Sequence, residues 1–229
     1  MNKIKSQNLK LFKAIDDLDL QAVRAAVEEG ADINARDKHG MIPLFWAIEY
    51  DRPELVDLLL SLGADVNQTT KAGAKPMQYA YGANAEIVKK LLDAGAKVKS
   101  VSAWHIVDSA SGGESFKLFM DAGIDIHAVQ DNGWTLLHQV WRPDIAHLLV
   151  KAGLDVNARD DDGRTPLHET VDKDIALIFI DAGADVNAKD NDGRTPLHAA
   201  IDPAFAAFLV SHGADTTVKD NKGNLPEFV

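Results

Sequence analysis

The sequence lacks cysteine entirely and contains no long apolar run among its 229 residues. The absence of cysteine excludes a disulfide framework, a cysteine-based zinc site and a thiol nucleophile. No run approaches the roughly eighteen apolar residues that a membrane-spanning helix requires, so we expect no membrane partner. The first ten residues carry three lysines but no apolar signal-peptide core. We therefore expect a cytoplasmic protein, with export or a processed leader left open.

Positive charge is also scarce. The chain has 24 lysines and arginines against 35 aspartates and glutamates, which gives a net charge of −11. Nucleic-acid binding requires clustered lysine and arginine, so no nucleic-acid partner is expected. The acidic balance favours a protein partner with a neutral or basic surface, although solubility alone would also explain it.

Two phrases recur along the chain. The segment Gly30-Ala31-Asp32-Ile33-Asn34 returns in closely similar form at residues 63–67, 153–157 and 183–187. The phrase Asp-Gly-Arg-Thr-Pro-Leu-His occupies residues 162–168 and 192–198, with weaker versions at 133–138 and 102–105. Self-similarity at a fixed interval of this length is typical of stacked structural repeats.

Each phrase has a local structural meaning. Thr165-Pro166 predicts the start of a helix, because threonine caps a helix and proline suits its first turn. Apolar residues at i, i+3 and i+4 spacing, such as Leu55, Leu58 and Leu59, predict a second helix. The recurring glycines follow this second helix, where a left-handed residue is needed. The polar segment with an Asp-Gly or Asn-Gly turn that comes next predicts a β-hairpin finger.

The repeated unit resembles the ankyrin repeat, which has a Thr-Pro-Leu-His-x-Ala signature and combines a β-turn with two helices. The resemblance covers nearly the whole chain and implies an all-α repeat solenoid of helix-turn-helix units with β-hairpin fingers. Several 30-residue repeats indicate the bacterial type. We expect one domain over residues 1–229, with N-terminal capping helices at 1–32, about six repeats at 33–219 and a truncated C-terminal cap at 220–229.

The glycine spacing predicts two departures from the pattern. Gly153, Gly183 and Gly213 recur every 30 residues, whereas Gly30 and Gly63 are 33 apart. The missing residues fall between the two helices, so the last three units should have a shortened first helix. Only residues 100 and 101 separate Lys99 from Ser102. The finger between the third and fourth units should therefore be absent or collapsed, which would leave a notch.

Four histidines occupy equivalent places in their units, namely His105, His138, His168 and His198. Equivalent residues of packed helices lie about 8–10 Å apart, too far to share a metal ion. The resemblance implies a structural role, in which each ring binds the neighbouring threonine and the backbone. A calcium loop at Asp160-Asp161-Asp162-Gly163 is not expected, because Ala158 stands at its first ligand position. We predict no catalytic residue, metal or cofactor.

The resemblance implies a concave binding surface made of the fingers and the exposed side of the first helices. The predicted partner-binding residues are Trp134, Arg164, Arg194, Asp161, Asp162, Asn132, Trp141, Arg142, Tyr50 and Met41. Tryptophan and arginine are enriched in binding hot spots. Two interpretations of Trp134 stay open: an exposed anchor, or a side chain that fills the space of the missing finger. Trp104 and Phe45 are expected in the core.

These observations predict a monomeric binding module, not an enzyme, with a folded protein or a peptide as its partner. An inhibitor, an immunity protein, an adaptor and an effector all fit this description. The alternative is an enzyme or small-ligand binder with an unrecognised site at the irregular notch near residues 100–142.

Overall fold

The computed structural model describes residues 3–99 and 101–227. The outermost residues of both predicted caps, 1–2 and 228–229, lie outside this part. The chain divides into two compact units, Met1–Ile124 and Asp125–Val229. The regular secondary structure of the described residues is helical, without a β-strand.

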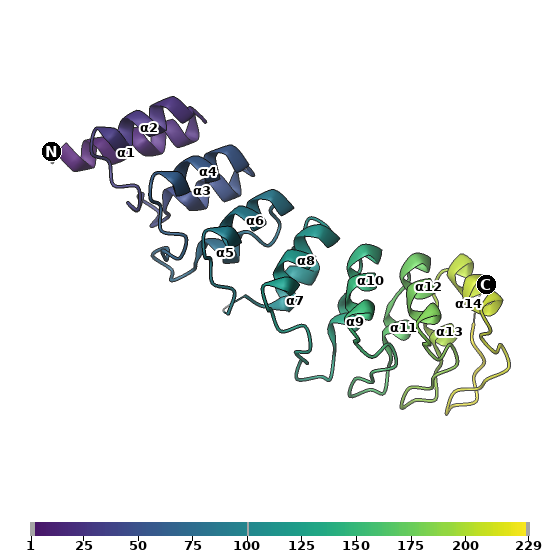
Figure 1. The fold of residues 1–229 in the computed structure, drawn as a ribbon. Helices are drawn as coiled ribbons and strands as arrows, with labels where there is room; N and C mark the ends of the chain where they lie inside the picture. The colour runs from purple at the N-terminus through teal and green to yellow at the C-terminus, as the bar shows by residue number, and fades with distance from the viewer. Residues whose placement is uncertain (1–2, 100, 228–229) are drawn as a thin grey trace. The chain divides into compact units, whose positions relative to one another are not determined.

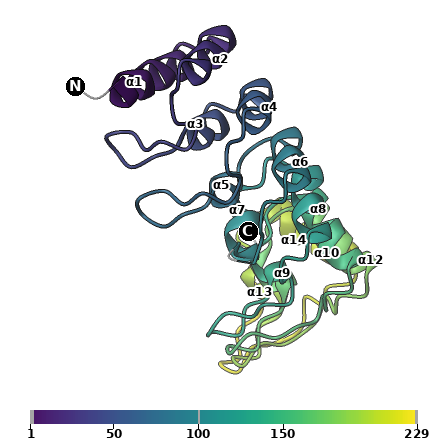
Figure 2. The same cartoon turned by 60° about the vertical axis from the view of Figure 1, so that its left-hand side comes forward.

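In its described residues, 3–99 and 101–124, the first unit consists of four helix pairs. The pairs follow one another in Figures 1 and 2. They are α1 (Lys3–Asp16) with α2 (Leu20–Glu28), α3 (Pro43–Glu49) with α4 (Pro53–Ser61), α5 (Pro76–Tyr79) with α6 (Ala85–Asp93), and α7 (Ala103–Ser109) with α8 (Gly113–Asp121). The second helices pack in sequence, α2 on α4, α4 on α6 and α6 on α8. Their apolar faces are buried, as at Leu59, Ile87 and Phe116, so each pair covers the hydrophobic side of the next.

The second unit, described up to residue 227, contains three helix pairs with very short first helices in that part. The pairs are α9 (Leu136–Gln139) with α10 (Pro143–Lys151), α11 (Pro166–Glu169) with α12 (Lys173–Asp181), and α13 (Pro196–Ala199) with α14 (Pro203–Ser211). The first helices pack on one another, α9 on α11 and α11 on α13. The predicted shortening is confirmed in all three. Helix α5 of the first unit is equally short, which the glycine spacing did not predict, because its missing turns are replaced by an irregular segment around Gly82.

The helix boundaries follow the predicted capping chemistry. Pro166 occupies the first turn of α11. The carboxylate of Asp202 caps α14, with Oδ1 accepting from the Ala204 amide at 3.3 Å and Oδ2 from the Phe205 amide at 3.1 Å. Gly153, just beyond α10, has φ of +91°. This left-handed conformation is the one expected of a glycine that ends a helix.

The fingers differ from the expected β-hairpins, because no strand forms in them within the described residues. The Asp160 amide donates to the Arg164 carbonyl at 3.0 Å, and the Gly163 amide donates to the Asp160 carbonyl at 2.9 Å. The Asp160 side chain closes the same loop, since Oδ1 accepts from the Asp162 and Arg164 amides at 3.0 and 2.8 Å. A carboxylate inside the turn thus replaces the ladder of a hairpin.

The predicted loss of one finger is confirmed. The connection from α6 to α7 comprises only residues 94–102, whereas α4 and α5 are joined by residues 62–75. The short connection turns at Val98, whose carbonyl accepts from the Val101 amide at 2.8 Å. Ser100, which was named in the prediction, lies outside the described residues.

Candidate protein-binding surface of the second unit

Buried histidines tie each finger to the preceding first helix. His168 Nδ1 accepts from the Thr165 amide at 3.0 Å and lies 2.9 Å from Thr165 Oγ1. Its Nε2 lies 3.1 Å from the Arg194 carbonyl. Because Nδ1 accepts, the proton of the neutral ring belongs on Nε2, which donates to that carbonyl. Burial lowers the pKa of His168, so the neutral form is the folded form at pH 7.

The same arrangement recurs at His138, which reaches the Arg164 carbonyl at 3.2 Å, and at His198, which reaches the Asn224 carbonyl at 3.4 Å. The structural role implied for these histidines is thus present three times. His105 departs from it, and the expectation for this residue was wrong. Its ring is exposed and stacks on Tyr81 with ring centroids 6.0 Å apart.

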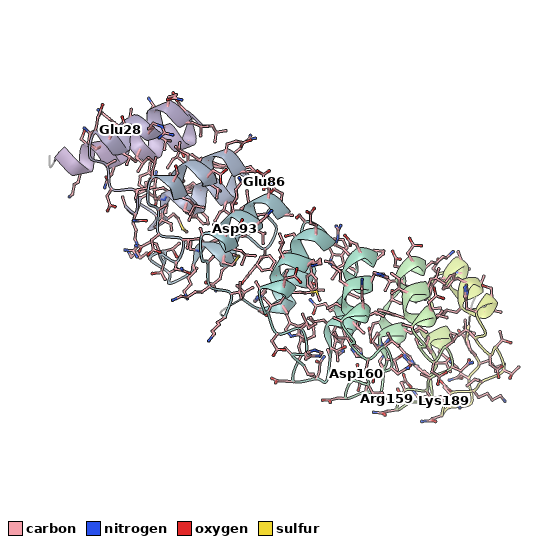
Figure 3. All side chains as sticks on the ribbon, viewed as in Figure 1. Glu28, Glu86, Asp93, Arg159, Asp160 and Lys189 are labelled. Atoms are coloured by element: carbon pink, nitrogen blue, oxygen red, sulfur yellow. The ribbon has the colours of Figure 1, made fainter. Side chains whose placement is uncertain are left out.

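Neighbouring fingers are joined by backbone and side-chain bonds. The Asn191 amide donates to the Asp162 carbonyl at 2.9 Å, and the Arg159 guanidinium donates to the Gly163 and Lys189 carbonyls at 2.9 and 2.6 Å. Arg159 and Lys189 lie on successive loops of the unit in Figure 3. These contacts hold the fingers as one rigid row. Sequence reasoning missed Arg159, although Arg36 repeats its position and also donates to the next finger, at the Thr69 carbonyl.

The first carboxylate of the acidic finger is engaged within the protein. Asp160 is buried, and its two oxygens accept from backbone amides and from the indole of Trp134. Asp161 and Asp162 are exposed at the tip. Within residues 3–99 and 101–227, no three or more histidine, aspartate or glutamate side chains converge as a metal site would require.

Trp134 lies at the position that Arg164 and Arg194 hold in the next two repeats. It is half-buried, stacks on His138 with centroids 6.1 Å apart, and donates from Nε1 to Asp160 Oδ2 at 3.0 Å. The indole is therefore oriented by the following finger. Asn132 is exposed at the tip of the same finger and accepts from the Trp134 amide at 3.2 Å.

The two arginines differ in their freedom. Arg164 forms an ion pair with Glu169 at 2.8 Å, and burial raises the pKa of that carboxyl while the arginine opposes the shift. Arg194 is exposed, and its Nε lies 4.0 Å from Asp220 Oδ2. A groove of about 490 Å³ runs between these arginines, lined also by Asp162, Asp192 and Ile201. Its aspartates and arginines give the second unit a polar groove beside exposed finger tips.

The other predicted residues lie elsewhere. Trp141 is exposed on the turn between α9 and α10, with the Arg142 guanidinium 5.6 Å from its ring centroid. Arg142 also pairs with Asp144 at 3.2 Å. Tyr50 belongs to the first unit, where its hydroxyl donates to Asp16 Oδ1 at 3.0 Å.

Burial and the bond to Asp16 raise the Tyr50 pKa. Met41 is half-buried in the first finger of the same unit. Phe45 is buried as expected, whereas Trp104, which was also expected in the core, is only half-buried.

Acidic charge is distributed unevenly between the units. Residues 1–124 carry 15 basic and 17 acidic side chains, a net charge of −2. Residues 125–229 carry 9 basic and 18 acidic side chains, a net charge of −9. The negative potential expected from the whole sequence therefore originates almost entirely in the unit with the shortened repeats.

A family model for ankyrin repeats, three copies long, matches residues 11–102, 105–190 and 142–220. The chain belongs to the ankyrin-repeat family. An ankyrin repeat protein of fowlpox virus (strain NVSL) is 32% identical over 155 residues, which cover 65% of this chain and 23% of the viral protein. One from Rickettsia bellii is 31% identical over 137 residues, 57% of this chain and 20% of its relative.

The mouse 2-5A-dependent ribonuclease is 43% identical over 67 residues, 29% of this chain and 9% of that protein. The chain thus spans less than a quarter of the length of these curated relatives. The crystal structure of the human ASB11 ankyrin repeat domain shares the fold. Its TM-score is 0.72 at 22% identity, over 90% of this chain and 98% of that domain. No helix in the described part of this ankyrin chain is long and apolar enough to cross a membrane.

Proposed function

We propose that this ankyrin-repeat chain binds a protein partner with a neutral or basic surface through the finger tips and groove of its second unit. Ankyrin repeats are in general protein-interaction modules. The observation that carries the proposal is the row of fingers joined by Arg159 and by the Asn191 amide, which presents exposed Asp161, Asp162 and Arg194 beside a groove of about 490 Å³.

Rigidity of this row favours binding. Association is weakened when loops must be ordered on contact, and bonds that already fix the fingers reduce this loss. The net charge of −9 in the unit attracts basic surfaces and speeds their encounter. Trp134 and the two arginines supply the side-chain types that dominate binding energy at interfaces. An inhibitor, an immunity protein, an adaptor or an effector would each use such a surface.

We do not assign a catalytic role to the histidines. In each of His138, His168 and His198, Nδ1 lies within hydrogen-bond distance of a threonine and Nε2 faces a backbone carbonyl. A general base needs a ring nitrogen that reaches the substrate. The pKa of His138 and of His168 is also lowered by burial, as expected of a neutral ring that serves as a strut.

The proposal is tested by affinity purification with the chain as bait. The variant carries Trp134→Ala, Arg164→Ala and Arg194→Ala. A matched control carries His147→Ala, Lys151→Ala and Asp181→Ala, all exposed on second helices of the same unit. We expect the first variant to lose the partner that the wild type and the control retain. Equal recovery of one partner by all three baits would refute this placement of the site.

A further inference from the structure

Three large apolar side chains are exposed at equivalent positions of the second unit. Trp141, Val171 and Ile201 are 55%, 61% and 89% exposed. They recur every 30 residues, and each stands directly before the residue that caps a second helix. Single exposed apolar residues are common, but the same exposure at one position of three successive repeats is a pattern. We call these three residues the turn row.

The turn row follows from the shortened first helices. The chain leaves α9 and α13 in an extended conformation at Val140 and Ala200, which are both buried. Successive side chains of extended backbone point to opposite sides, so the next residue points outward. In the first unit the residues at this place are Leu18, Asp51, Ala83 and Ser111, and only the first of them is a large apolar residue. A row of large apolar side chains is therefore particular to the second unit.

The spacing of the row selects a partner geometry. Helices α9, α11 and α13 pack in succession, and packed helices lie about 8–10 Å apart. We therefore expect a similar spacing for the turn residues that follow these helices. Residues on the same face of a strand recur about every 6.7 Å, or about 13 Å for every second one, and neither spacing matches that of the row. Residues seven apart on a helix lie about 10.5 Å apart on one face. A helix with an apolar residue at every seventh position fits all three members.

The charge around the row selects the partner's polar residues. Residues 141–144, 171–174 and 201–204 contain four aspartates against one arginine and one lysine. The whole unit carries a net charge of −9. Lysine and arginine beside the apolar residues of the partner would complement this surface. A second copy of the chain is disfavoured, because it would place two units of the same charge against each other.

We propose that the turn row is a docking site for a basic amphipathic helix whose apolar residues recur every seventh position. The inference rests on the proposed protein-binding function and concerns a neighbouring surface that shares one residue with the groove. Ile201 also borders the groove described above, whereas Trp141 and Val171 lie on the turns alone.

The test uses a synthetic helical peptide of about three heptads, with leucine at every seventh position and lysines on both sides of the leucines. Its binding to the full chain is measured by fluorescence anisotropy. The variant W141S/V171S/I201S should bind it at least about tenfold more weakly. The finger-tip variant W134A/R164A/R194A keeps the turn row and loses two positive charges, so it should bind at least as tightly as the wild type does. Thermal unfolding checks that the row variant stays folded, as expected for exposed substitutions.

Two control peptides test separately the basic charge and the seven-residue spacing that the proposal requires of the partner helix. One replaces the lysines by glutamates, and the other moves the leucines to every fifth position, which places them on different faces of the helix. Both should bind at least about tenfold more weakly than the first peptide. The proposal is overturned if the basic peptide does not bind, if the row variant binds it equally, or if either control peptide matches it. Loss in the finger-tip variant alone would instead transfer helix binding to the groove.

Discussion

Replacement of His168 by alanine tests whether a neutral buried ring holds two repeats together. The substitution removes the acceptor of the Thr165 amide and the donor to the Arg194 carbonyl, both within an almost fully buried site. Each hydrogen bond contributes about 0.5–1.5 kcal/mol, and a cavity remains where the ring was. We expect the free energy of unfolding to fall by about 2–4 kcal/mol at pH 7.5, measured by urea denaturation.

The loss should depend on pH in one direction. Burial lowers the pKa of His168 in the folded state below the value of about 6.5 expected in the unfolded chain. Between these two values the unfolded chain binds more protons, so the wild type loses stability as the pH falls below about 6.5. The slope is at most about 1.4 kcal/mol per pH unit for one histidine. The alanine variant lacks this group, so the gap between the two proteins should narrow from pH 7.5 towards pH 5.

His147→Ala is the matched control, because His147 is exposed on α10. It should change the urea midpoint little at every pH. His138, whose pKa is lowered by burial in the same way, is present in all three proteins and cancels from the difference. A gap that stays constant or widens on acidification would refute the assignment of a neutral His168 strut.

Three further substitutions test the packing by urea denaturation. Leu167→Ala should lower the free energy of unfolding by about 2–5 kcal/mol, because Leu167 is buried. A loss below about 1 kcal/mol, the range expected for Leu177→Ala at an exposed position, would contradict that burial. Gly163→Ala should destabilise more than Gly153→Ala, because both have positive φ but only the Cβ at 163 would meet Asn191 Oδ1 at 2.5 Å; equal losses would disprove the close contact between fingers. Asp202→Ala should lower stability by about 0.5–2 kcal/mol through loss of the α14 cap, whereas an unchanged midpoint would show that the cap is dispensable.

The repeat architecture could be predicted from sequence because its determinants are local. Threonine with proline starts a helix, and glycine ends one, wherever they occur at the right spacing. The shortened α9, α11 and α13 followed from counting residues between these signals. The short α5 could not be predicted in this way, because its repeat keeps nearly the full number of residues and has an irregular segment around Gly82. The length of a repeat therefore does not determine how many of its residues are helical.

The chemistry of the candidate site was less predictable, because it depends on which atoms meet across repeats. The sequence places Trp134 and Arg194 at finger tips. It does not show that the indole donates to Asp160 or that Arg194 lies 4.0 Å from Asp220, because both contacts cross between repeats. In the finger at residues 160–164, the Asp160 side chain accepts amides that a hairpin would pair with its partner strand. Val171 and Ile201 were overlooked, although their 30-residue spacing from Trp141 was visible in the sequence.

The predicted monomeric state provides a last test of the charge argument, since exposed apolar rows favour self-association. A net charge of −9 on the unit that carries the row opposes it, and salt screens this repulsion with a Debye length of about 10 Å at 0.1 M. Light scattering after gel filtration should therefore give one chain per particle at low salt. If association appears at high salt, W141S/V171S/I201S should abolish it. If dimers form at low salt and are still present in this variant, the turn row is not the dimer interface, and the net charge of the unit does not prevent self-association.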